Sequence, residues 1–282
     1  AGGRAEASPG SPVECTAAAT INNGVLMSVG TGGIVNLNTA TLNTLTLAGT
    51  FNANNNTTTS LIGTITNNGV ISLNSGGNFT DLSLSGDVTL TGGGTINLTN
   101  ADRILGSGIL TNTNNLIQGD TNNTGSLGAN AIGIINQASG VVNANNSGLV
   151  LNVDPNSTNG LVNHGLMEAS NGGILRLNGN GAGGVTNTGA TITAQTGSEV
   201  QLTNSVSITG GTLSSVGTGL IRNLNTATLN SLTLVGSFIA NNNTTTPLTG
   251  TITKPGATPN NSTGNFTTLT LNGNLPLTGR RT

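Results

Sequence analysis

A glycine-marked motif recurs along the chain at regular intervals, and it restricts the possible folds more than any other feature. The motif is Asn-x-Gly followed by apolar residues: INNGVLM (21–27), ITNNGVISL (65–73), LVNHGLMEA (161–169) and VTNTGATI (185–192). The glycines of these copies, at 24, 69, 165 and 189, lie 45, 96 and 24 residues apart, which is about two, four and one periods of about 23 residues. A period in the twenties is typical of solenoids, in which each repeat forms one coil that packs on the next.

The coils are built from strands. Segments such as TLNTLTL (41–47) and EVQLT (199–203) alternate apolar and polar residues, as half-buried strands do. Gly and Asn occur every few residues, which would destabilise any long helix. A coil of about 23 residues with three short strands is one turn of a parallel β-helix. The sequence therefore predicts an all-β, single-stranded parallel β-helix (a β-solenoid) with about 12 turns of roughly 23 residues, and with Thr and Asn ladders on its outer faces.

A much longer segment is also repeated. Residues 36–66 match residues 223–253 at 25 of 31 positions. The likeness extends over 20–95, which recurs as 207–282. Eight turns of about 23 residues account for the offset between the two copies. We divide the chain into an irregular amino-terminal segment, 1–18, and a parallel β-helix, 19–282, and interpret it as a fragment of a longer repetitive protein.

Composition excludes several classes of function. Only 6% of the residues are charged and the net charge is −2, so there is no basic surface for nucleic acid. No apolar run reaches the roughly 18 residues of a membrane-spanning segment. The single cysteine, Cys15, cannot form an internal disulfide, and the single histidine, His164, occupies the variable position of an Asn-x-Gly turn and is expected at an exposed corner. We expect no cofactor.

Carboxylates offer the best route to catalysis. Asp81 and Asp102 are separated in the sequence by close to one turn, so they are expected to stack on neighbouring coils with Arg103 beside them. Paired carboxylates are what glycoside cleavage requires, and the set resembles the acid-plus-arginine clusters of β-helical pectin-degrading enzymes. The alternative is a group of solvated surface charges. The second block copy has Thr268 in place of Asp81, and the chain has no Trp or Tyr for a sugar platform.

Two segments partly resemble calcium loops. DTNNTG (120–125) places Asp120 and Asn122 at alternate positions with a glycine sixth, but the twelfth position, which should be glutamate, is Ala131. DPNSTNG (154–160), beginning at Asp154, is a similarly partial match. Ordinary Asx-turns explain both segments equally well.

Repeated Thr-x-Thr triplets at 64–66, 191–193 and 251–253 raise the alternative of ice binding, in which a flat threonine grid faces the crystal. The spacings between these triplets are not whole multiples of a turn of about 23 residues. We therefore expect that these triplets do not stack into one grid.

The recurring I-x-N-x-G-x-I turn, together with VTLTGGGTINL (88–98), resembles bacterial haemagglutinin-like adhesins and autotransporter passenger domains over residues 20–280. That resemblance implies a right-handed β-helix, secreted or displayed on a bacterial cell surface, that acts as a stalk or adhesin. The long period also favours right-handed coiling over the shorter hexapeptide type. The implied partners are host or matrix glycans or surface proteins. The resemblance carries no functional residue over to this chain.

Three functions are compatible with these patterns: an extracellular structural or adhesive rod, a polysaccharide-acting hydrolase or lyase on the same scaffold, and an ice-binding protein. The first is our expectation. Uncapped ends of a solenoid expose strand edges, so end-to-end or edge-to-edge self-association is also predicted, unless terminal segments cover those edges.

Overall fold

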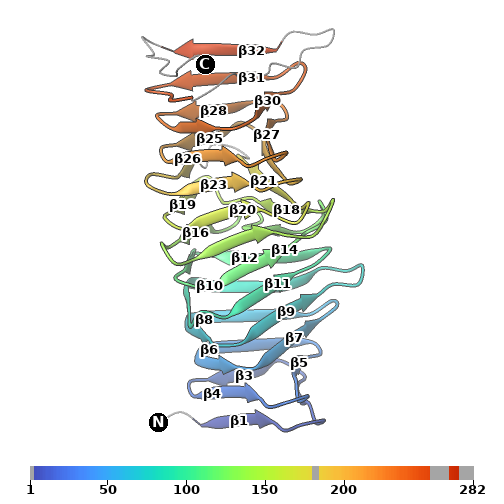
Figure 1. Ribbon diagram of the computed structural model, residues 1–282. Helices are drawn as coiled ribbons and strands as arrows, with labels where there is room; N and C mark the ends of the chain where they lie inside the picture. The colour runs from blue at the N-terminus through green and yellow to red at the C-terminus, as the bar shows by residue number, and fades with distance from the viewer. Residues whose placement is uncertain (1–2, 180–183, 255–266, 273–282) are drawn as a thin grey trace.

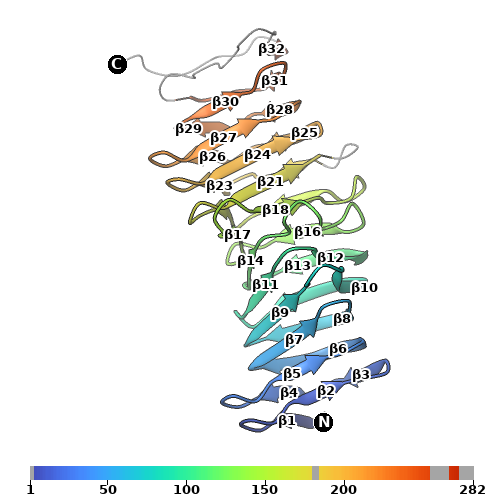
Figure 2. The same ribbon diagram turned by 90° about the vertical axis from the view of Figure 1, so that its right-hand side faces the viewer.

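The protein coils as an elongated stack of parallel β-strands (Figure 1, Figure 2). The computed structural model describes residues 3–179, 184–254 and 267–272. Every regular element in these ranges is a strand, and each strand pairs in parallel with strands one turn away. This confirms the predicted parallel β-helix. The same ranges contain no helix of the length and apolarity needed to cross a membrane.

Each turn contributes strands to three faces, which we call X, Y and Z. The X face is an 11-stranded sheet with one strand from each turn. Its strands are β2 (Val13–Cys15), β5 (Ile34–Asn36), β7 (Thr50–Asn54), β9 (Val70–Asn74), β11 (Thr95–Leu98), β14 (Leu116–Gly119), β17 (Val141–Ala144), β20 (Leu166–Ala169), β23 (Thr191–Ala194), β26 (Thr212–Ser215) and β29 (Thr233–Val235).

In the amino-terminal, or lower, turns the Y and Z faces are joined by three long strands that bend from one face to the other. They are β6 (Thr39–Ala48), β8 (Thr58–Asn67) and β10 (Thr80–Thr91). The Y face otherwise holds β3 (Ala19–Asn22), β12 (Asp102–Ser107), β15 (Ser126–Leu127), β18 (Val150–Val153), β21 (Ile174–Asn178), β24 (Glu199–Thr203), β27 (Leu220–Asn223) and β30 (Phe238–Ala240).

The Z face holds the remaining strands, each paired with the Z-face strand of the neighbouring turn. They are β1 (Arg4–Ala7), β4 (Val25–Ser28), β13 (Ile109–Asn112), β16 (Gly133–Asn136), β19 (Leu161–Asn163), β22 (Val185–Thr186), β25 (Val206–Thr209), β28 (Ala227–Asn230), β31 (Thr245–Thr249) and β32 (Thr268–Asn272).

Inward apolar side chains stack in register from turn to turn over the described residues. On the X face one residue per turn lies directly above the last, and all but the first are buried. The stack runs Val13, Ile34, Phe51, Ile71, Ile96, Ile117, Val142, Met167, Ile192, Leu213, Leu234. Burial of each such side chain contributes about 1.5–3 kcal/mol, and the buried apolar residues form one continuous cluster over the described residues.

The stack also measures the turn. Ile34 and Leu234 lie nine turns apart, so a turn averages about 22 residues. Single turns differ in length: the turn from Ile34 to Phe51 is the shortest in the stack, and the turn from Ile71 to Ile96 is among the longest. The structure has about 11 turns, close to the expected 12. The period read from the sequence was therefore an average over turns of unequal length.

The amino-terminal segment corrects the expectation that residues 1–18 lie outside the solenoid. β1 pairs with β4, and β2 pairs with β5, in the same parallel registers as later turns. Ala7 and Cys15 point inward and are only 1% and 2% exposed. Short alternation in RAEA and VEC is enough to turn small apolar side chains toward the core, so the first turn begins within this segment.

In most copies of the Asn-x-Gly motif the asparagine points into the molecule, whereas Asn22 in the first copy is exposed. We expected asparagine ladders on the outer faces, but several motif asparagines are fully buried and bond to one another between turns. Asn136 Nδ2 donates to Asn163 Oδ1 at 2.9 Å, and Asn163 Nδ2 donates to Asn187 Oδ1 at 2.8 Å. These bonds satisfy amides that would otherwise be costly to bury.

The glycine of the motif allows the turns to approach each other at this corner. A Cβ added to Gly165 would collide with the carbonyl oxygen of Gly140 in the turn below. The variable residue between the asparagine and the glycine points outward, and His164 is exposed there, as predicted.

The repeated block keeps its local structure but changes face. Asn36 Nδ2 donates to Thr59 Oγ1 at 3.0 Å, and its copy Asn223 donates to Thr246 Oγ1 at 2.8 Å. However, Asn36 lies on an X-face strand and Asn223 lies on a Y-face strand. The offset between the copies is therefore eight turns plus one face, not a whole number of turns. Residues 255–266 and 273–282 of the second copy lie outside the described residues.

The buried ladder can be tested at two adjacent positions. Asn163→Ala leaves Asn187 Oδ1 without its donor and the Gly165 N–H without the Asn163 oxygen that accepts from it. We expect the free energy of unfolding to fall by about 2–3 kcal/mol, measured by guanidinium denaturation. His164→Ala, in the next residue, is the control and should change it by less than about 0.5 kcal/mol. Equal effects of the two substitutions would contradict a structural role for the ladder.

Candidate functional site

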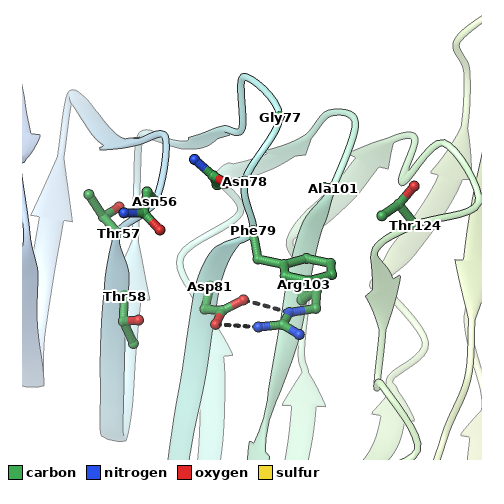
Figure 3. A pocket seen from close by; sticks show the side chains of 10 residues that line it. All are labelled: Asn56, Thr57, Thr58, Gly77, Asn78, Phe79, Asp81, Ala101, Arg103 and Thr124. Atoms are coloured by element: carbon green, nitrogen blue, oxygen red, sulfur yellow. Dashed lines mark hydrogen bonds and ion pairs between the residues drawn. The ribbon is translucent and has the colours of Figure 1, made fainter.

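A polar depression of about 430 Å³ lies on the Y face beside the loops that lead into β8, β10 and β12 (Figure 3). We call it the Phe79 pocket. It is lined by Asn56, Thr57, Thr58, Gly77, Asn78, Phe79, Asp81, Ala101, Arg103 and Thr124. Residues from successive turns line it together, so the depression depends on the stacking of the solenoid rather than on any one segment.

An ion pair forms one wall of the pocket. Asp81 and Arg103 are direct neighbours in the β10–β12 register, both pointing outward. Arg103 Nε donates to Asp81 Oδ1 and Arg103 Nη2 donates to Asp81 Oδ2, each at 2.7 Å. Such bidentate pairs are geometrically well defined. The Arg103 side chain is 29% exposed and the Asp81 side chain is 16% exposed. The structure thus brings together two of the three predicted site residues.

Phe79 covers the guanidinium. Its ring centroid lies 3.8 Å from Arg103 Cζ, a cation–π contact that helps to position both groups (Figure 3). The loop that carries Phe79 is held by Asn55, whose Oδ1 accepts from the backbone N–H of Gly76 and Asn78 at 2.6 and 3.1 Å. Phe79 is nonetheless 41% exposed, unlike the buried Phe51. An aromatic ring is therefore presented to solvent at a defined place.

Asp102 lies on the opposite side of its strand from Arg103. It is fully buried and closes a corner of the core: Oδ1 accepts from the Ser75 backbone N–H at 3.1 Å and Oδ2 from the Thr99 backbone N–H at 2.7 Å. Burial raises the pKa of Asp102 to about 6, and the hydrogen bonds from Thr99 and Ser75 only partly oppose this. The structure gives Asp102 a place in the core, away from the Phe79 pocket.

The arrangement limits what chemistry the pocket can do. Acid–base cleavage of a glycoside uses two carboxyl groups on either side of the scissile bond. Asp81 is the one carboxylate among the residues lining the pocket, and Arg103 already binds both of its oxygens. The pocket presents hydrogen-bond donors, acceptors and an aromatic ring, which are groups suited to binding.

The three calcium candidates lie in different settings. Asp120 is buried, and its oxygens accept from Asn100 N–H at 3.1 Å and Asn146 Nδ2 at 2.6 Å. Asn122 is exposed in a turn with a φ of 43°. Asp154 is buried with Oδ1 lacking a hydrogen-bond partner, and burial raises its pKa. Nowhere in the described ranges do three or more His, Cys, Asp or Glu side chains gather as metal ligands would.

A second ion pair lies further along the Y face. Arg222 Nε contacts Glu199 Oε1 at 2.9 Å, and Gln201 Nε2 donates to the same oxygen at 2.9 Å. Arg176 Nε donates to Gln201 Oε1, also at 2.9 Å. Among the described arginines only Arg103 makes a cation–π contact, and this second group lines neither of the two depressions.

Threonines form a grid on the Z face of the lower turns. The triplet 64–66 does not stack with 191–193, which lies on the X face, as expected. It stacks instead with threonines of neighbouring turns that belong to none of the three Thr-x-Thr triplets. The columns are Thr46–Thr66–Thr91 and Thr64–Thr89–Thr111, with the buried Leu45, Ile65, Leu90 and Asn112 between them.

The main residue that sequence reasoning missed is Phe79. The alternation of side chains along the strand could have identified it. Leu82 and Leu84 point inward, so the odd-numbered residues Asp81 and Phe79 both point outward. The same rule places Asp102 with the inward Ile104. A spacing of about one turn shows that residues are stacked, but only parity shows whether they share a face.

The buried carboxyl makes stability depend on pH. The pKa of Asp102 is higher in the folded chain, about 6, than the value of about 4 in an unfolded chain. Folding therefore favours the protonated form, and the free energy of unfolding should fall by about 2–3 kcal/mol as pH rises from about 4 to about 6.

Guanidinium denaturation at several pH values measures this change. Asp102→Asn should flatten the slope in that window, whereas Asp87→Asn, at an exposed position, should preserve it. An unchanged slope in Asp102→Asn would rule out this carboxyl as its origin.

Comparisons with models of protein families, with curated proteins and with solved structures found no match for this chain. What is established is the parallel β-solenoid, its three strand faces and the geometry of its surface. Its function has to be inferred from those surfaces.

Proposed function

We propose that the chain is an extracellular structural and adhesive rod, secreted by a bacterium or displayed on its surface. Its scaffold is a continuous core without breaks between turns over the described residues, which suits a rod that transmits load along its axis. The resemblance of its turns to haemagglutinin-like and autotransporter-type repeats supports the setting. Glycans or proteins of a host or matrix surface are the partners that the proposal names.

The single observation that carries the proposal is a polar ladder along the X face. Outward side chains at one position of successive X-face strands are mostly amides and hydroxyls, and two polar residues just past strand ends, Asn145 and Ser170, bond to them. Gln118 Nε2 donates to Asn97 Oδ1 at 2.9 Å, and Asn145 Nδ2 donates to Gln118 Oε1 at 3.0 Å. Higher up, Ser170 Oγ donates to Asn143 Oδ1 at 2.9 Å. The result is a long surface with many equivalent weak contact points, which is what multivalent adhesion needs.

The geometry favours this rod over a polysaccharide-acting enzyme. An enzyme on this scaffold needs its catalytic groups in one groove, and Asp102 points into the core while Asp81 is held by Arg103. Adhesion requires no such convergence. Adhesion through many weak contacts also explains why the chain carries few charges and many short polar side chains.

The proposal can be tested by retention on immobilised pectin, xylan, cellulose and chitin, with turnover assayed in parallel. We expect retention without turnover, with little loss in high salt because the X-face ladder has few charges. Joint replacement of Asn97, Gln118 and Asn143 by Ala should reduce retention several-fold, since many weak contacts act together.

Each single replacement should have a small effect, and circular dichroism serves as the control for folding. Turnover that disappears in Asp81→Asn would establish the enzyme instead, and lack of retention on every surface would refute adhesion.

A second candidate function, ice binding, is favoured by the Z-face threonine grid. Stacked strands repeat about every 4.8 Å, and outward residues repeat about every 6.6 Å along a strand. The hydroxyls of the six threonines in the two columns therefore form a regular two-dimensional array. A regular, uncharged and rigid array is the kind of surface that can match a crystal lattice.

Ice-crystal habit and thermal hysteresis in the presence of the protein test this second function. If the grid binds ice, faceted growth should appear and should be lost in Thr89→Lys, at the centre of one column. Thr212→Lys, on the X face, is the matched control and should keep it. Round, unmodified crystals with the unaltered protein would exclude ice binding.

A further inference from the structure

We propose that the Phe79 pocket binds one neutral pyranose unit of a glycan, without cleaving it. This rests on the proposed adhesive function and deepens it, because it gives the rod one specific site among its distributed contacts. No other depression described on the surface combines a charged pair with an aromatic ring: the depression at the X-face edge, of about 300 Å³, is lined by uncharged polar and aliphatic residues only.

Size and polarity indicate the class of ligand. A volume of about 430 Å³ falls within the range of about 300–1,000 Å³ that is usual for small-molecule sites. Such sites are normally lined by apolar side chains, but here seven of the ten lining residues are polar or charged. An apolar ligand would leave those groups without partners, at a cost in affinity. A ligand with several hydroxyl groups would pair with them.

The ion pair supplies complementary donors and acceptors in fixed positions. Arg103 has five N–H donors, of which Asp81 accepts two, and no other described residue accepts from the remaining three. The Asp81 carboxylate keeps further lone pairs beside them. Because a sugar hydroxyl both donates and accepts, two neighbouring hydroxyls can bind the carboxylate and the guanidinium together. The pair is held in place before binding, so little ordering cost remains.

Phe79 supplies the apolar part of the site. One side of its ring is in contact with the Arg103 guanidinium, while 41% of the residue remains exposed. A pyranose ring has a face of C–H groups that packs on an aromatic ring, and burying both surfaces is favourable. The Asn55 anchor holds the loop, so the ring is already positioned. Asn56 and Asn78 lie at the rim with amides that can bind outlying hydroxyls (Figure 3).

Charge selects a neutral sugar over an acidic one. The positive charge of Arg103 is balanced by Asp81 at 2.7 Å, so the pocket has no net charge to attract a uronic acid. A sugar carboxylate placed near the free guanidinium donors would also lie close to the Asp81 carboxylate, and like charges repel. Neutral hexosides avoid this repulsion.

Saturation-transfer NMR and titration with methyl glucoside, methyl galactoside, methyl mannoside and methyl galacturonide test the proposal on the whole chain. We expect at least one neutral glycoside to bind. Phe79→Ala, which leaves the ion pair in place, should weaken it about tenfold, or about 1.4 kcal/mol. Arg103→Gln should also weaken it. Glu199→Gln disturbs the other Y-face ion pair, which lines no depression, and should leave binding unchanged.

Three results would overturn the site: no binding of any neutral glycoside, equal binding by Phe79→Ala and the unaltered chain, or stronger binding of the galacturonide. Thermal unfolding of each variant confirms that the fold is intact, and Asp81→Asn supplies a second disruption of the pocket if Arg103→Gln does not fold.

The two proposals fail separately. Retention on polysaccharide surfaces without glycoside binding would refute the pocket and leave the rod, whereas glycoside binding without retention would refute the adhesive rod and leave the pocket.

Discussion

The whole structure depends on the parallel hydrogen-bonded contact between each strand and the strand one turn away. A single turn of about 22 residues cannot bury its own apolar side chains, because its inward residues meet only across a narrow interior. Stacking solves this by placing like residues over one another, as in the X-face stack from Ile34 to Leu234. The register of the backbone ladder therefore determines the core, the buried amide bonds and the position of every outward side chain.

Buried polar groups follow the same rule as the apolar core. Asn136, Asn163 and Asn187 pass hydrogen bonds from turn to turn, and Asp102 closes a corner by accepting from two backbone amides. These groups are tolerated because their partners repeat with the turns. Outside, the same repetition produces the X-face amide ladder and the Z-face threonine grid. The function then depends on which of these repeated surfaces, or which local departure from the repeat, binds a partner.

The Phe79 pocket is such a departure, and it shows how far sequence reasoning reached. Spacing correctly placed Asp81 and Arg103 on neighbouring turns, since residues about one turn apart stack. It also grouped Asp102 with them, because spacing alone does not separate the two sides of a strand. Nothing in the spacing indicated that the Asn55 side chain holds the loop that carries Phe79, since that contact joins residues in different turns.

By itself the sequence determined the strands, the alternation that turns their apolar residues inward, the tight Asn-x-Gly corners and the solenoid they build. These are local properties, and the two block copies reproduce them down to the bond from Asn36 to Thr59 and from Asn223 to Thr246. Only the tertiary structure decided which face each segment occupies. The intervening turns differ in length, so the second copy begins one face further round the coil, and identical residues point in different directions from the axis.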